Sequence, residues 1–221
     1  MKTEKITLVS YTKGEEILNV ITHIAGLIIP VFILIKFPPL CQGKIFPLLC
    51  TYLYALGTTM TFVSSAIYHG IKNEKYKKLF RVIDHSAIFF AVAGTVTGCV
   101  PSVFQKSSVI AAILMLVFSW LSVIAGLVLT IFFFEKYKAV RMGLYIFSSA
   151  FCSLLGAGTY FHLPIGAFLS LIIGSASLLT GCVFLRIGTK KRYIHSVFHI
   201  FIVAGLAVYC YGIYNYTYLL L

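Results

Sequence analysis

Seven near-continuous apolar stretches set the strongest limit on how this chain can fold. Each holds about 19 residues or more, and a helix needs roughly 20 residues to cross the hydrocarbon core of a bilayer. In lipid, a helix satisfies all of its own backbone hydrogen bonds. The stretches are residues 17–35, 45–71, 82–104, 107–134, 142–161, 165–185 and 194–221. We therefore predict an all-α fold, a bundle of seven transmembrane helices.

The composition excludes a soluble protein of this size. Of the 221 residues, 60% are apolar and only 11% are charged, and so few polar groups cannot cover a soluble domain. Six cysteines without a Cys-x-x-Cys pair predict neither a disulfide framework nor a thiolate metal site. We expect a short cytoplasmic segment over residues 1–16 and one membrane domain over residues 17–221.

Lysine and arginine are distributed unequally over the two ends of the predicted helices. Fifteen lie on the amino-terminal segment and on the second, fourth and sixth connections, whereas three lie on the opposite end. The fifteen are Lys2, Lys5, Lys13, Lys72, Lys75, Lys77, Lys78, Arg81, Lys136, Lys138, Arg141, Arg186, Lys190, Lys191 and Arg192. The positive-inside rule then places the amino terminus in the cytoplasm and the carboxyl terminus outside, in a multi-pass protein of the cell membrane. The net charge of +12 predicts contact with anionic lipids at the cytoplasmic face and not with nucleic acid.

Ionisable side chains inside the spans gather near the predicted cytoplasmic end. His69, Asp84 and His195 each lie three residues from a boundary cation, so at about 1.5 Å per residue they sit at one depth. Ser65 precedes His69 by four residues and His199 follows His195 by four, so each pair shares one helix face. Three different helices therefore present polar groups at the same level.

The first predicted helix carries a polar face at the same end. Glu16, Asn19 and His23 are spaced i, i+3 and i+7, which places all three on one side of a helix.

Taken singly, several of these residues have structural explanations. His69 near a helix carboxyl end and Asp84 near an amino end both suit the helix dipole, and Asp84 could pair with Arg81. Ser65 could hydrogen-bond the carbonyl of Thr61, as hydroxyls often do in membrane helices.

Two imidazoles on one helix face are harder to explain by packing alone. His195 and His199 can present two nitrogens to one ion, and His69 at the same depth supplies a third. Three neutral imidazoles with one open position are typical of catalytic zinc. Nitrogen ligands of this kind also favour zinc over magnesium or calcium. His85 is assigned to packing or an interfacial contact, and His162 to a solvated outer turn.

The motifs resemble those of a known family. The segments EILNVITH (residues 16–23), SAIYH (65–69) followed by Asp84, and HSVFH (195–199) resemble the signature motifs of the hemolysin III and progestin and adipoQ receptor family, most closely its bacterial members. The resemblance implies zinc on His69, His195 and His199, with Asp84 as the acid near the metal's water and Ser65 close to the metal. The motif of Glu16, Asn19 and His23 is shared, without an assigned role.

Two functions follow from different classes. The first is a zinc-dependent hydrolase acting on a membrane lipid amide or ester at the cytoplasmic side, with Asp84 accepting a proton and either Ser65 or the zinc itself stabilising the oxyanion. The family resemblance implies that such a hydrolase would be ceramidase-like. The alternative is a non-enzymatic membrane protein, a pore former or a regulator of membrane state, in which a structural zinc ties the second and seventh helices together. Because no span carries a stripe of charges, the sequence gives the pore-forming version little support.

Overall fold

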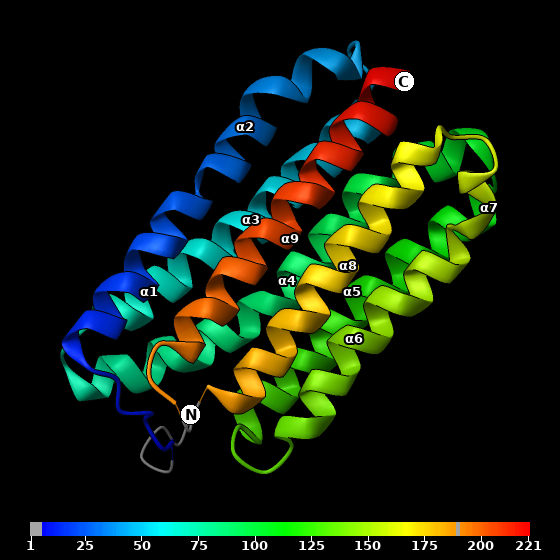
Figure 1. The fold of residues 1–221 in the computed structure, drawn as a ribbon. Helices are drawn as coiled ribbons and strands as arrows, with labels where there is room; N and C mark the ends of the chain where they lie inside the picture. Colours follow the sequence, from blue (N-terminus) through cyan, green and yellow to red (C-terminus); the bar gives the residue numbers. More distant parts are fainter. Residues whose placement is uncertain (1–5, 189–190) are drawn as a thin grey trace.

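The computed structural model describes residues 6–188 and 191–221, and the regular structure within them is helical. The helices lie alongside one another in an elongated bundle (Figure 1). They are α1 Lys13–Gly26, α2 Ile28–Lys36, α3 Ile45–Gly70, α4 Glu74–Lys106, α5 Val109–Phe132, α6 Lys138–Leu155, α7 Ala157–Tyr160, α8 Ile165–Ile187 and α9 Ile194–Tyr216, with 3-10 turns η2 Pro38–Cys41 and η3 Tyr218–Leu220. The predicted all-α fold is confirmed. The predicted cations Lys2, Lys5 and Lys190 lie outside the described residues.

Among the residues that the structure describes, six helical stretches are long and apolar enough to cross a membrane. The stretch that includes α1 and α2 counts as one of them, and α6 followed by α7 forms a further rod beside α5 (Figure 1). The start of α1 and the α3–α4, α5–α6 and α8–α9 connections lie at one end of the bundle, and the carboxyl terminus lies at the other. The count of lysines and arginines made above assumes that these connections lie together at one end.

The first span is a broken helix, whereas the sequence predicted a single helix over residues 17–35. The break falls at Leu27, three residues before Pro30. Proline lacks an N–H group, and its ring clashes with the carbonyl four residues earlier, here that of Gly26. A Cβ atom on Gly26 would lie only 2.5 Å from the Phe62 ring, so glycine also permits the close approach of α1 to α3.

Helix α4 begins earlier than residue 82, where the third predicted span starts. Asn73 caps it by accepting a hydrogen bond from the Tyr76 N–H, and α4 starts at Glu74. Four of the five cations predicted for a connecting loop therefore lie on the first turns of α4; they are Lys75, Lys77, Lys78 and Arg81. The boundary was missed because these turns are polar and extend past the apolar stretch.

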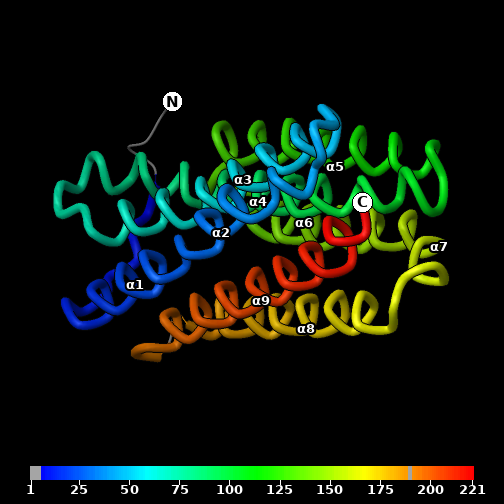
Figure 2. Tube along the Cα trace, turned by 90° about the horizontal axis from the view of Figure 1, so that it is seen from above, coloured from blue at the N-terminus to red at the C-terminus, as the bar shows by residue number. Residues whose placement is uncertain are grey.

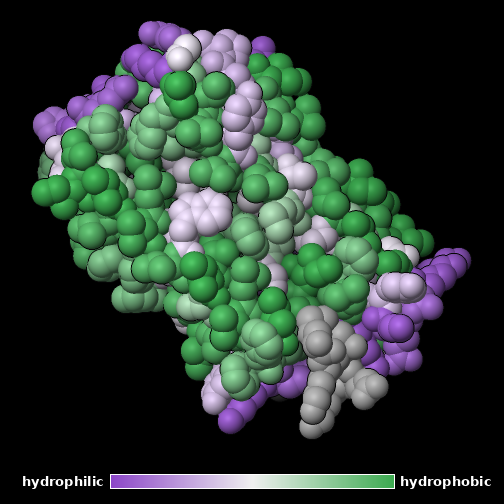
Figure 3. Space-filling view, turned by 180° about the vertical axis from the view of Figure 1, so that it is seen from behind, coloured by the Kyte–Doolittle hydropathy of each residue, from purple (hydrophilic) through white to green (hydrophobic). Residues whose placement is uncertain are grey.

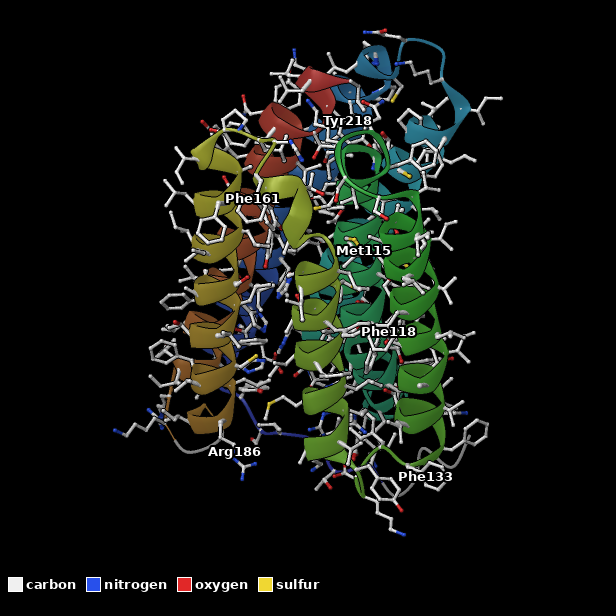
Figure 4. All side chains as sticks on the ribbon, turned by 90° about the vertical axis from the view of Figure 1, so that its right-hand side faces the viewer. Met115, Phe118, Phe133, Phe161, Arg186 and Tyr218 are labelled. Carbon is white, nitrogen blue, oxygen red and sulfur yellow. The ribbon has the colours of Figure 1, made fainter. Side chains whose placement is uncertain are left out.

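The fifth predicted span, residues 142–161, is also divided. It ends as α6 at Leu155, and α7 continues after Gly156. Figure 4 shows Met115 and Phe118 on α5, where Phe118 meets Phe151 of α6 with ring centroids 4.5 Å apart. Seen from above, α8 lies along α9 (Figure 2), and α4 packs against α3, α5 and α9.

The surface matches a protein surrounded by lipid. Hydrophobic residues form a broad belt, and hydrophilic residues gather toward the two ends (Figure 3). Arg186 and Phe133 mark one end, while Phe161 and Tyr218 mark the other (Figure 4). All six cysteines are free, as the sequence predicted.

Candidate metal centre

Three histidines converge at the end of the bundle where α1 begins. His69 comes from the last turn of α3, and His195 and His199 come from the first turns of α9. Their potential ligand atoms all lie within 4.8 Å of one another, and the Nε2 atoms of His195 and His199 are 3.0 Å apart. We call these three residues the histidine cluster. The structure thus brings together the three residues that the sequence predicted as metal ligands.

The residues present fit a metal ion. A tetrahedral metal with bonds of about 2.0–2.1 Å to nitrogen separates its ligands by roughly 3.4 Å, which lies between the two separations above. The Nε2 atom of His69 is buried and has no hydrogen-bond partner among the described residues. Leaving such a group unsatisfied costs about 1–3 kcal/mol, so a ligand at this nitrogen would remove a penalty. The cluster could therefore bind a metal.

Glu16 orients the first of these histidines. Its Oε2 atom lies 2.6 Å from His69 Nδ1, and its Oε1 atom accepts a hydrogen bond of 2.7 Å from Lys77 Nζ. A carboxylate can only accept, so we infer that Nδ1 carries the proton and that the Nε2 lone pair is free. Histidines that bind metals are usually held in this way by a second partner on the other nitrogen.

The other two residues of the predicted polar face of α1, Asn19 and His23, contact α3 and α9. Asn19 Oδ1 accepts a hydrogen bond of 2.6 Å from Ser196 Oγ on α9. Asn19 Nδ2 lies 3.2 Å from His69 Nδ1 on α3, a packing contact when Nδ1 donates its proton to Glu16. The ring of His23 meets that of His199 edge-on, with centroids 4.1 Å apart. Both ring nitrogens of His23 are buried without a partner in the described part of the chain.

The predicted catalytic residues, Ser65 and Asp84, are neighbours of one another. Ser65 is buried on α3, one turn before His69, and it is a polar neighbour of the half-buried Asp84 on α4. Within the described residues, the group of donor atoms that share the 4.8 Å limit does not include Asp84. The geometry therefore separates three candidate ligands from the carboxylate and hydroxyl of the predicted catalytic residues.

The structural explanations considered for this pair are not what the structure shows. Arg81 approaches Glu135, at 3.7 Å between Nη1 and Oε1, and no ion pair with Asp84 is present among the described residues. The carbonyl of Thr61 accepts a hydrogen bond of 3.4 Å from Ser64 Oγ, and within the described residues it accepts none from Ser65.

His85 and His162, which the sequence did not assign to the metal site, lie where it predicted. His85 packs edge-on against Phe134, with ring centroids 5.1 Å apart, and His162 is exposed in the turn before α8.

Sequence reasoning missed an aromatic cover on the cluster. The Tyr11 ring stacks on His195 with centroids 4.9 Å apart and an interplanar angle of 24°, and its centroid lies 5.5 Å from that of His69. Burial raises the pKa of the Tyr11 phenol, so it stays neutral at physiological pH.

The start of α1, next to Tyr11, has a recognisable signal in the sequence. Thr12 and Glu15 form a capping box, the Thr-x-x-Glu pattern that marks helix amino termini. Glu15 also accepts a hydrogen bond of 2.8 Å from the Tyr193 N–H, which lies just before α9. The pattern identifies the start of α1, although it cannot reveal the contact with Tyr193.

The fold and the site together define a multi-pass helical membrane protein with a buried histidine cluster near one end of its bundle. The profile of the Haemolysin-III related family matches residues 11–210, so the chain belongs to this family. It is 27% identical over 208 residues to Hemolysin-3 of Bacillus cereus, covering 93% of both chains. It is 26% identical over 199 residues to the Hemolysin-3 homolog of Bacillus subtilis (strain 168), covering 89% of this chain and 92% of the relative. It is also 25% identical over 216 residues to the human monocyte to macrophage differentiation factor, covering 92% of this chain and 85% of that protein. The family predicted from the motifs is thereby confirmed.

Proposed function

We propose that this protein is a zinc-dependent hydrolase that acts on a membrane lipid amide or ester. The proposal also takes the bundle to cross the cell membrane seven times, with the amino terminus and the histidine cluster on the cytoplasmic side. The proposal rests on the number of candidate metal ligands in the cluster. Within the described residues, three histidines share the cluster and no fourth His, Cys, Asp or Glu joins them.

Three ligands favour a catalytic over a structural metal. Structural zinc sites almost always have four protein ligands, whereas catalytic sites have three and leave one position open. Neutral imidazoles suit zinc among the transition metals, and three of them occur at known catalytic zinc sites. When bound, it supplies a Lewis acid and activates water near neutral pH.

The neighbouring side chains have separate roles in the proposal. The Asp84 carboxylate accepts the proton from the attacking water and later delivers it to the leaving group. The Ser65 hydroxyl, next to Asp84, donates a hydrogen bond to the oxyanion that develops on the lipid carbonyl. Glu16 keeps the His69 ring in the orientation that the cluster requires.

The orientation rests on the arrangement of the basic connections. The connections that hold most of the cations lie at the end where α1 begins (Figure 1), and the positive-inside rule assigns that end to the cytoplasm. Exposed cations such as Lys191 and Arg192 would attract anionic lipids there, at about 1 kcal/mol per charge. The lipid substrate would enter from the apolar belt.

Metal content and turnover test the proposal on the same preparations. Detergent-purified wild type, His195→Ala/His199→Ala and Asp84→Ala are compared by elemental mass spectrometry and by hydrolysis of a ceramide and an ester lipid. We expect about one zinc per chain in wild type and Asp84→Ala, and little in the double variant.

Turnover should fall about 10²- to 10⁴-fold in Asp84→Ala, the usual effect of losing a general base. Zinc-loaded wild type that hydrolyses neither lipid, or Asp84→Ala with unchanged turnover, would contradict the hydrolase. Stoichiometric zinc without turnover would instead favour the non-enzymatic membrane protein with a structural metal.

A further inference from the structure

The chain before α1 crosses the end of the bundle that holds the histidine cluster. We call residues 6–12 the N-terminal strap. Its first residue, Ile6, is buried against Val82 of α4 and against Phe134, which follows α5. The Thr7 N–H donates a hydrogen bond of 3.1 Å to Glu135 Oε1. The strap is therefore attached to the opposite side of the bundle from α1.

The other end of the strap is fixed by the start of α1. Glu15 Oε2 accepts hydrogen bonds from the Thr12 N–H at 2.8 Å and from Thr12 Oγ1 at 2.7 Å. The other oxygen of this carboxylate accepts the bond from Tyr193 described above. With both ends held, the residues between them have little freedom to leave the bundle.

Tyr11 lies where this strap passes over the cluster. His69 and His199 are buried, whereas His195 is only half-buried. The Tyr11 ring stacks on this least buried histidine, and the interplanar angle of 24° makes the contact face to face. Tyr11 therefore covers one face of the least buried histidine of the cluster.

We propose that Tyr11 is a positioning residue that walls the histidine cluster off from the cytoplasm and holds the plane of the His195 ring. The inference rests on the proposed cytoplasmic placement of this end, and it does not require lipid hydrolysis. The face of His195 that Tyr11 covers then becomes accessible to water-soluble molecules only when the strap moves away from the bundle. A molecule that enters from the bilayer does not meet this barrier.

The reactivity of individual histidines toward diethyl pyrocarbonate tests the wall without a metal. Metal-free protein in detergent is labelled briefly, and modified peptides are quantified by mass spectrometry. Exposed His162, at the other end of the bundle, serves as the internal reference. In wild type we expect His195 to react much more slowly than His162.

Three substitutions separate the ring from general packing. Tyr11→Ala should raise the labelling rate of His195 relative to His162 by about fivefold to tenfold, the scale of one lost aromatic contact. Tyr11→Phe keeps the ring and should match wild type. Tyr76→Ala removes an exposed tyrosine, 53% accessible, from the same end of the bundle, and it should also leave the rate unchanged.

A variant remote from the cluster shows whether the strap acts as a unit. Ile6→Ala removes the buried attachment but touches no histidine, so it should raise His195 labelling without altering the ring contact directly. Melting temperatures of all variants are measured beside the labelling rates. Equal His195 labelling in wild type and Tyr11→Ala, or an equal increase in Tyr76→Ala, would overturn the proposal.

A second readout follows zinc-loaded protein. Release of zinc to excess EDTA should be faster in Tyr11→Ala than in Tyr11→Phe, which should behave as wild type. Wild type that binds no zinc would remove the proposed metal site, but the labelling of metal-free protein would still decide whether the wall exists. Equal release rates in Tyr11→Ala and wild type would count against the wall.

Discussion

Replacing Glu16 by glutamine should weaken metal binding without removing a ligand. The carboxylate lies 2.6 Å from His69 Nδ1, and loss of such a partner typically costs about 10- to 100-fold in metal affinity. Glutamine keeps a side-chain oxygen that can accept the Nδ1–H, and charge-assisted hydrogen bonds are roughly twice as strong as neutral ones. We therefore expect a loss near the lower limit for Glu16→Gln, about tenfold or 1.4 kcal/mol. Glu16→Ala should approach the upper limit.

The adjacent carboxylate provides a matched control. Glu15 is more deeply buried than Glu16, but its hydrogen bonds go to Thr12 and to the Tyr193 N–H. Glu15→Gln should keep the metal affinity of wild type. It should lower the melting temperature, because a capping contact contributes about 0.5–2 kcal/mol to stability.

Competition with a chelating dye in detergent at fixed pH measures these affinities, and His69→Ala defines complete loss. If Glu16→Gln binds zinc as tightly as wild type, Glu16 does not tune His69. An equal loss in Glu15→Gln and Glu16→Gln would mean that the effect comes from the start of α1 as a whole.

Two further predictions concern stability. A Cβ atom on Gly57 would overlap the Phe90 carbonyl oxygen, so Gly57→Ala should destabilise the α3–α4 contact by about 1–3 kcal/mol. At Gly143, no atom of the residues that the structure describes lies within 4 Å of an added Cβ, so Gly143→Ala should be neutral or stabilising in thermal melts. Burial raises the pKa of Glu135, but hydrogen bonds from Lys138 and from the strap N–H outweigh it and lower the pKa overall. The attachment of the strap is then complete above the ordinary glutamate pKa and is lost as pH falls through the lowered value. Hydrogen exchange of the strap should rise over that range in wild type, and exchange that stays constant would contradict this attachment.

The bundle was predictable because lipid leaves few alternatives for an apolar stretch of this length. The helix ends were less so, since they depend on local contacts that hydropathy does not record. The Asn73 cap extends α4 into polar residues, and Pro30 divides the first span. Both signals are visible in the sequence, yet neither alone fixes where a helix begins or ends.

The three candidate ligands were predictable because ionisable side chains are rare inside spans. Their supporting contacts were not. Glu15 and Glu16 are adjacent carboxylates, and only the direction of each side chain in the folded protein shows that Glu16 reaches His69. Tyr11 and Ser196 are of common residue types, and their contacts with the site depend on tertiary structure.

The hydrogen bond between Ser196 and Asn19 joins residues 177 positions apart. During synthesis, the first helix is therefore made long before its partner on α9 exists. A chain that stops before α9 contains His69 but neither His195 nor His199, so a nascent or truncated protein cannot assemble the cluster. Metal loading would consequently report on complete insertion of the last helix, and it would distinguish finished molecules from partly inserted ones.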